Sequence, residues 1–256
     1  MTSLRVAAAQ ISTGPDPAAN LTTATEAVRR AADAGATLVA LPEATLAAFG
    51  TDLRAVAEPL DGPFATGLRK VAADRGVVVI AGLFEPADDG RVHNTLLATG
   101  PGVEASYRKI HLYDAFGSRE SDLVAPGNEL VTIEVDGVRV GLATCYDLRF
   151  AAQFTDLGRA GAELIVVPAS WGAGPAKEEQ WDLLTRARAS DAQSWLLACD
   201  QAWTPPVGTD PLGIGRSALV DPLGHTRSHL AADPGLLVGE IDTDLPATVR
   251  ARVPIL

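Results

Sequence analysis

Three residues that together suit acyl-bond cleavage stand just after the ends of predicted strands: Glu43, Lys109 and Cys145. A cysteine hydrolase needs a thiolate, a base that takes the thiol proton, and a positive or N–H group aimed at the oxyanion that forms on the substrate. These three residues supply one of each. In α/β proteins, functional groups gather at the ends of strands, so one sheet edge would bring together residues that are far apart in sequence.

Each of these signals is weak when it is taken alone. Val138, Val140 and Leu142 alternate with other residues, which is the period of a strand, and Cys145 follows its end. A free cysteine in an apolar run is usually a small buried hydrophobe, and a Glu or Lys at a strand end is usually a solvated charge. The polar residues after Cys145, and the two similar positions upstream, favour the chemical interpretation.

Pairing of cysteine with histidine is the competing hydrolase design. Of the four histidines, His111 stands near a motif, two residues after Lys109, so it remains an alternative catalytic group. The other histidines lack the Cys or acidic spacing of a zinc site. The sequence also lacks a phosphate-binding glycine loop, a G-x-S-x-G elbow and a dinucleotide fingerprint. We therefore expect neither a metal nor a cofactor.

The composition favours one acidic, cytoplasmic domain that spans residues 1–256. With 47% hydrophobic residues, a chain of this length can bury a large core, and α/β folds of this size are often one domain. A net charge of -11 argues against nucleic acid or an anionic membrane as a partner. Two cysteines in apolar segments suit a reducing compartment, and we find neither a signal peptide nor about 18 uninterrupted apolar residues.

The elements that must position the three residues alternate between strands and helices. Residues 110–128 lack periodicity and are predicted to form a long loop, a feature that is usually functional or mobile in a compact domain. Apolar periodicity and turn residues predict the following elements. Strands are predicted at 4–10, 37–41, 77–84, 92–99, 103–108, 131–135, 138–143, 163–167, 195–199, 217–220, 226–230 and 236–241, and helices at 17–34, 64–75, 151–159 and 177–191.

At the three residues the sequence resembles the nitrilase superfamily of carbon–nitrogen hydrolases. The Glu-Lys-Cys triad of that superfamily is carried by motifs similar to PEA at Glu43, YRKIHL at Lys109 and CYDLRF at Cys145. The order and spacing of these motifs, with GAELIVVPASW and RARASDAQSW further on, extend the match over nearly the whole chain. The resemblance implies an α/β fold, a four-layer α-β-β-α sandwich, and commonly a homodimer or higher homo-oligomer that continues the sandwich across its helices.

The resemblance also implies further site residues. Glu120, in the long loop, is similar to a second glutamate that relatives hold near the lysine, and Tyr146, Arg149 and Trp171 are substrate-binding candidates. Arg149 lies about one helical turn after the nucleophile. Its guanidinium suits bidentate recognition of a substrate carboxylate or of a structural partner such as Asp147, and both alternatives stay open.

CYDLRF is most similar to the amidase branch, including omega-amidases and deaminated-glutathione amidases, because true nitrilases typically carry Trp where Tyr146 stands. The expected reaction is cleavage of the amide of a small carboxylate-bearing substrate, with a thioester on the cysteine and release of ammonia. Hydrolysis of an N-carbamoyl group or a nitrile by the same triad is an alternative, and a non-catalytic binding or scaffold protein is another. Asp200 stands where relatives often have Asn, a difference that bears on subfamily and substrate.

Overall fold

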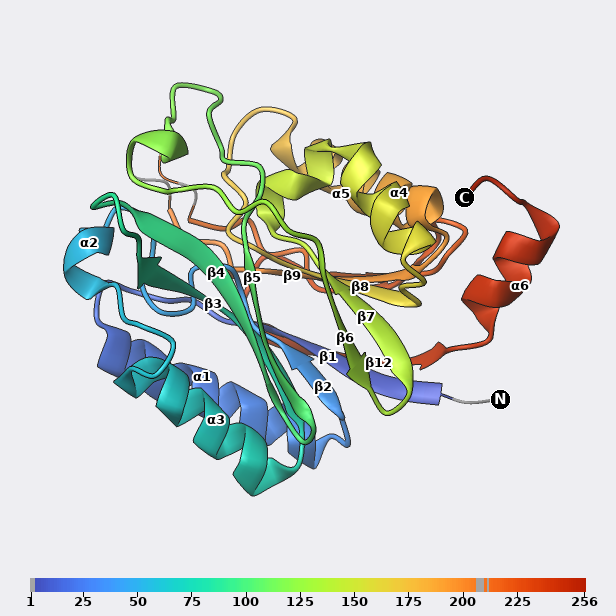
Figure 1. Cartoon of the computed structure of the whole chain (residues 1–256), viewed down its shortest axis with the longest axis horizontal. Coiled ribbons are helices and arrows are strands. Elements are labelled where there is room, and N and C mark those ends of the chain that lie inside the picture. The colour runs from blue at the N-terminus through green and yellow to red at the C-terminus, as the bar shows by residue number, and fades with distance from the viewer. Residues whose placement is uncertain (1–2, 206–209, 211) are drawn as a thin grey trace.

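The computed structural model describes residues 3–205, 210 and 212–256, whose strands form two six-stranded mixed sheets (Figure 1). The first sheet has the order β12 (Gly235–Asp242), β1 (Ser3–Gln10), β2 (Leu38–Ala40), β3 (Val78–Pro86), β4 (Val92–Gly100) and β5 (Val103–Arg108). The second has the order β11 (Thr226–His229), β10 (Ala218–Val220), β9 (Trp195–Asp200), β8 (Leu164–Ala169), β7 (Val138–Leu142) and β6 (Val131–Val135).

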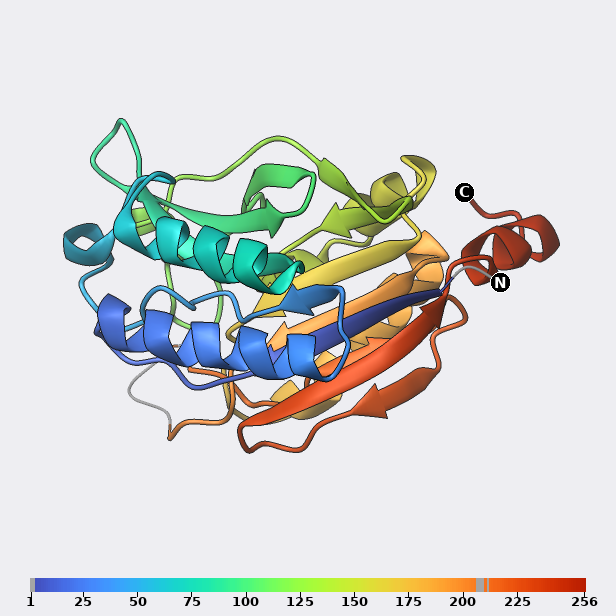
Figure 2. The ribbon, with the colours of Figure 1, turned by 90° about the horizontal axis from the view of Figure 1, so that it is seen from below.

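Helices cover the outer face of each sheet, as the two perpendicular views show (Figures 1 and 2). Helices α1 (Pro17–Asp33) and α3 (Pro63–Arg75) pack on the first sheet, and α4 (Ala151–Arg159) and α5 (Lys177–Ala192) pack on the second. A separate apolar layer joins the inner faces of the two sheets. The fold is therefore a four-layer α-β-β-α sandwich, which confirms the fold class that the resemblance implied.

Strand β1 shows why a central strand of this fold has a nearly continuous apolar sequence. Ala7 and Ala9 belong to the apolar layer beneath α1, while Val6 and Ala8 belong to the layer between the sheets. Because both faces of the strand are buried, its sequence is nearly continuous in apolar residues instead of alternating with polar ones. The small alanines let α1 lie close to the sheet.

The predicted helices and strands are present, with small shifts of their ends. The N-terminal signals of α1 are confirmed, because the Asp16 side chain accepts a hydrogen bond from the N–H of Ala18 and Pro17 occupies the first turn. Sequence reasoning missed α2 (Leu53–Val56), α6 (Leu245–Arg252) and the 3₁₀ turn at Glu120–Asp122. Each is short and buries few apolar side chains, so it leaves no periodic pattern in the sequence. None of the described helices combines the length and the apolar character needed to cross a bilayer.

Candidate active site

The three predicted residues meet where the ends of strands from both sheets come together. Glu43 lies three residues after β2, Lys109 follows β5 directly, and Cys145 follows the end of β7. Strand β5 runs in the same direction as β2, because β2 and β3 are parallel and two antiparallel pairings then connect β3 to β5. All three side chains line one cavity of about 360 Å³. The structure thus brings together residues that are far apart in sequence, since Glu43 lies 66 positions before Lys109 and Lys109 lies 36 positions before Cys145.

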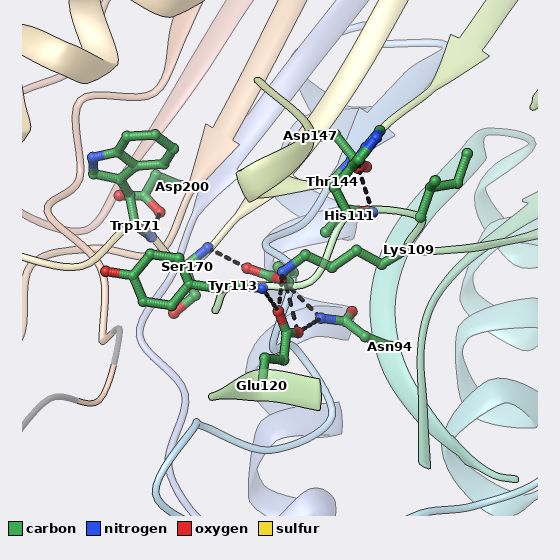
Figure 3. A network of polar contacts seen from close by, with 12 residues as sticks. Asn94, Lys109, His111, Tyr113, Glu120, Thr144, Asp147, Ser170, Trp171 and Asp200 are labelled. Atoms are coloured by element: carbon green, nitrogen blue, oxygen red, sulfur yellow. Dashed lines mark hydrogen bonds and ion pairs between the residues drawn. The ribbon is translucent and has the colours of Figure 1, made fainter. Parts of the chain in front are cut away.

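Lys109, which lines this cavity, lies between two carboxylates in a network of polar contacts (Figure 3). Its Nζ is 2.8 Å from Glu43 Oε1 and 2.9 Å from Glu120 Oε2, and its side chain is 2% exposed. Burial, the largest single influence, lowers the pKa of Lys109, but the combined attraction of Glu120 and Glu43 outweighs it, so that pKa lies well above its usual value. The ammonium therefore stays charged and fixed in position.

Both oxygens of the Glu43 carboxylate accept hydrogen bonds. Oε1 accepts hydrogen bonds from Lys109 and from Asn94 Nδ2 at 2.8 Å, and Oε2 accepts one from the backbone N–H of Ser170 at 2.9 Å. Burial raises the pKa of Glu43, and the nearby charge of Glu120 raises it further, while Lys109 pulls it down. A buried carboxylate with a raised pKa is a stronger base than a solvated one.

Cys145 occupies a strained turn between β7 and the 3₁₀ helix Cys145–Arg149. Its φ of 43° lies in the left-handed region, which costs a residue with a Cβ on the order of 1–3 kcal/mol and commonly marks a functional position. Burial raises the pKa of the Cys145 thiol well above its usual value, and the charge of Glu43 adds to this, against the pull of Lys109. The resting thiol is therefore neutral, and a base must take its proton before it can attack.

His111 stabilises the turn that carries Cys145. Its Nδ1 lies 2.9 Å from Asp147 Oδ1, and its ring stacks on Phe150 with the ring centres 3.6 Å apart. Asp147 is fully buried and also accepts the backbone N–H of Thr144 at 2.8 Å. Glu43 and Lys109 line the cavity with Cys145, whereas His111 is absent from the described residues that line it. This geometry favours Glu43 over His111 as the base.

The three substrate-binding candidates contact one another beside the cavity. The Arg149 guanidinium lies over the rings of Tyr146 and Trp171, at 5.7 and 5.1 Å from their centres, and donates to Gln180 Oε1 at 2.7 Å. Asp147, the structural partner considered from the sequence, is instead bonded to other groups. Among the described residues, the cavity wall includes Tyr113 but not these three candidates, and Tyr113 contacts Tyr146 edge-on at 5.2 Å.

Sequence reasoning missed several residues that hold the charged groups. The amide of Asn94 donates to both Glu43 and Glu120, and the backbone N–H of Tyr113 donates to Glu120 Oε2 at 2.6 Å. Asp200, named from the sequence as a difference from relatives, holds the backbone instead, because it accepts the N–H groups of Trp171 and Ile214 at 2.7 and 2.9 Å. Asn94 carried a usable signal, because a polar amide within an apolar strand must find buried partners.

Gly82 is a further missed residue, and it sets how closely the Glu43 segment approaches β3. A Cβ built at Gly82 would lie 1.5 Å from the backbone oxygen of Glu43. A glycine inside a predicted strand indicates such a close approach of another backbone, so the signal was present in the sequence.

We expect Gly82→Ala to displace Glu43, to destabilise the fold by about 1–3 kcal/mol, and to lower kcat/KM more than the loss of stability explains. Thermal unfolding and amide turnover below the melting transition measure the two effects. Gly14→Ala is the control, because a Cβ there meets nothing within 4 Å and no positive φ is required. If Gly82→Ala matched this control in both measurements, the close approach would not be needed for the site.

Within the described residues, no group of three or more His, Cys, Asp or Glu side chains is arranged to hold a metal ion. The cavity lining instead includes an acid, a cation and a thiol, in Glu43, Lys109 and Cys145.

Comparison with known proteins agrees with this geometry. The family profile described as Carbon-nitrogen hydrolase matches residues 5–251. The chain belongs to this family. Hydrolase Rv0480c of Mycobacterium tuberculosis is 52% identical to this carbon–nitrogen hydrolase over 99% of the chain and 94% of the relative. The deaminated glutathione amidase of Escherichia coli O157:H7 is 37% identical over 89% and 86% of the two chains, which confirms the predicted resemblance to the amidase branch.

A solved structure is similar over the same range. It is that of an amidase mutant from Nesterenkonia sp. AN1, described as showing covalent addition of the acetamide moiety of fluoroacetamide at the active site cysteine. Its TM-score to this carbon–nitrogen hydrolase is 0.81, with 26% sequence identity and coverage of 98% of this chain and 95% of that chain.

Proposed function

We propose that this carbon–nitrogen hydrolase cleaves the amide of a small carboxylate-bearing substrate and releases ammonia through a thioester on Cys145. The observation that carries the proposal is the single cavity lined by Cys145, Glu43 and Lys109, with Lys109 fixed between two glutamates. Two comparisons support it. A relative is named as an amidase, and a similar amidase is described with a covalent adduct at its active site cysteine.

In the first half of the proposed reaction, Glu43 takes the thiol proton of Cys145 as the sulfur attacks the carbonyl carbon of the amide. The oxyanion that forms is stabilised by the Lys109 ammonium and by the backbone N–H of Tyr146. Glu43 then gives its proton to the leaving nitrogen, the C–N bond breaks, and ammonia departs. The acyl group remains on the sulfur as a thioester.

In the second half, Glu43 takes a proton from water, and the resulting hydroxide attacks the thioester carbonyl. The C–S bond breaks, the acid leaves, and the proton returns to the sulfur, so that the resting thiol is restored. Glu120 acts through Lys109 in this proposal: it keeps the ammonium charged and holds it at 2.9 Å, without contacting the reacting atoms.

The proposed base makes a prediction for the pH dependence. Because burial raises the pKa of Glu43 above the ordinary 4.5, the carboxylate that must act as the base is lost at a higher pH than in a solvated glutamate. We expect kcat/KM to fall as the pH decreases through a midpoint above 4.5, measured with a substrate that does not titrate in that range, such as butyramide. A midpoint at or below 4.5 would argue that another group removes the thiol proton.

An activity screen tests the reaction class. We expect release of ammonia from monoamides of short dicarboxylic acids, with weaker turnover of simple amides and none of nitriles. Release of carbon dioxide together with ammonia from N-carbamoyl acids would support the carbamoyl alternative instead. If mass spectrometry detected no acyl group on Cys145 with any of these compounds, the protein would be a non-catalytic member of the fold.

A further inference from the structure

A second cation, Lys177, shares the aromatic cluster that surrounds Arg149. Lys177 is the first residue of α5 and is only 7% exposed. Its Nζ lies 3.6 Å from the ring centre of Phe116 and donates a hydrogen bond to the hydroxyl of Tyr113 at 3.2 Å. The Arg149 guanidinium lies over the same Phe116 ring at 5.7 Å. Two positive charges therefore share one set of rings.

No carboxylate in the described part of the chain forms an ion pair with either cation. Neither Lys177 nor Arg149 has a carboxylate oxygen within ion-pair distance among residues 3–205, 210 and 212–256, and Arg149 Nε is buried there without a hydrogen-bond partner. Glu178, the neighbour of Lys177, pairs with Arg216 instead. Burial lowers the pKa of Lys177, and the charge of Arg149 lowers it further. The two positive charges thus repel each other without a compensating partner, and binding of an anion would relieve this repulsion.

The backbone around Lys177 adds to the uncompensated positive charge. The first turn of a helix carries partial positive charge, so a cation there is less stable than an anion would be. Ala176, directly before Lys177, and Phe116, above the cations, have φ values of 58° and 55°, which disfavour residues with a Cβ. Such strain commonly accompanies ligand-binding segments.

Tyr113 connects Lys177 with the catalytic cavity. Its ring lines the cavity that holds Cys145, and its hydroxyl accepts the hydrogen bond from Lys177. Among the described residues, the cations that line the cavity itself are Lys109, which is held by two glutamates, and Arg119. Arg119 suits an anion less well than Lys177, because its side chain is 73% exposed and already pairs with Asp122 at 3.5 Å. A buried cation without a carboxylate partner gains more from an incoming anion than a solvated, paired one does.

We propose that Lys177 and Arg149 together form a carboxylate-binding subsite, and that Lys177 determines the preference of the enzyme for acidic over neutral amides. This inference rests on the proposed function, since it assigns the acidic end of the substrate that reacts at Cys145. The carboxylate replaces the contact of Lys177 with the Phe116 ring, while Arg149 supplies a planar pair of N–H donors. Neutral amides gain nothing from either charge.

The decisive experiment compares Lys177→Met with wild type on succinamate and butyramide, an acidic and a neutral amide of equal chain length. We expect KM for succinamate to rise about tenfold to hundredfold more than KM for butyramide, which is the loss typical of a charge-assisted contact. Lys177→Arg should retain most of the preference because it keeps the charge. The matched control is Lys70→Met, which removes the same charge from a side chain that is 74% exposed and paired with Asp74.

Equal increases in KM for both amides would make Lys177 a structural support of the aromatic cluster and overturn the inference. Calorimetry with the Cys145→Ala protein separates this inference from the proposed function, because it measures binding of succinamate without turnover. If succinamate binds and Lys177→Met weakens that binding, the subsite stands even if wild type hydrolyses no amide. If Lys177→Met leaves succinamate binding unchanged, or if succinamate does not bind, the subsite is wrong whatever the turnover.

Discussion

Replacing Cys145 by alanine will abolish amide turnover and leave the fold intact. The thiol sits in the cavity beside Glu43 and Lys109, and without sulfur no thioester forms. Its raised pKa shows that the neutral thiol is the stable form, so Cys145→Ala removes no resting charge from the site. Ammonia release measures turnover, and circular dichroism and thermal unfolding measure the fold.

Cys199 provides the control for this substitution. It is fully buried in β9 and its thiol donates to the backbone oxygen of Ala40 at 3.2 Å, in the layer between the sheets. Cys199→Ala should therefore cost some stability, on the order of 1 kcal/mol, and retain most of the activity. Loss of activity in a folded Cys199→Ala protein, with Cys145→Ala still active, would show that the nucleophile is assigned to the wrong cysteine.

Glu43→Gln will lower kcat/KM by about 10²- to 10⁴-fold, the usual contribution of a general acid and base. Glutamine keeps the shape of the side chain and an oxygen that accepts the N–H of Ser170 or the Lys109 ammonium. It cannot take the thiol proton or return it to the leaving nitrogen. Lys109 retains its ion pair with Glu120, so the buried ammonium is not left without a counter-charge and the protein should fold.

Glu85→Gln is the matched control for Glu43→Gln. Glu85 is a second buried glutamate of the first sheet, bonded to Thr95 at 2.6 Å and to Arg108 at 3.2 Å, and it is not among the described residues that line the cavity. We expect a loss of stability from Glu85→Gln without a comparable loss of kcat/KM. Activity of Glu43→Gln within tenfold of wild type would assign the proton transfers to another group.

The arrangement of Glu43, Lys109 and Cys145 was predictable because each lies within three residues of the end of a strand. Apolar periodicity identified the strands, and the ends of strands that run in the same direction share one sheet edge. Local sequence patterns therefore predicted that residues far apart in sequence lie close together. The four layers followed from the family resemblance and not from periodicity. The carboxyl network around Lys109 was accessible only in part, because Glu120 comes from an aperiodic loop whose path depends on contacts such as that of Tyr113.

The burial of Lys177 is a feature that a single sequence does not predict. Helical spacing predicted the helix it begins, yet a lysine in a first turn is usually solvated, and nothing local shows that its ammonium lies buried beside Phe116. That contact depends on the path of the 110–128 loop, which follows strand β5 of the first sheet, whereas α5 packs on the second sheet. Gly82 is the opposite case, since its place inside an apolar strand signalled the close approach to Glu43, although the partner segment could not be named.

The Glu43 segment also joins the two halves of the sandwich mechanically. It leaves the first sheet after β2, yet its backbone N–H donates to Ala169 of the second sheet at 3.3 Å, and its carboxylate accepts the N–H of Ser170. Sliding one sheet over the other by even a fraction of an ångström would thus change the alignment of base and thiol. The value of kcat therefore depends on the relative position of the two sheets. Substitutions that repack the apolar layer between the sheets should change kcat even though they lie far from the cavity.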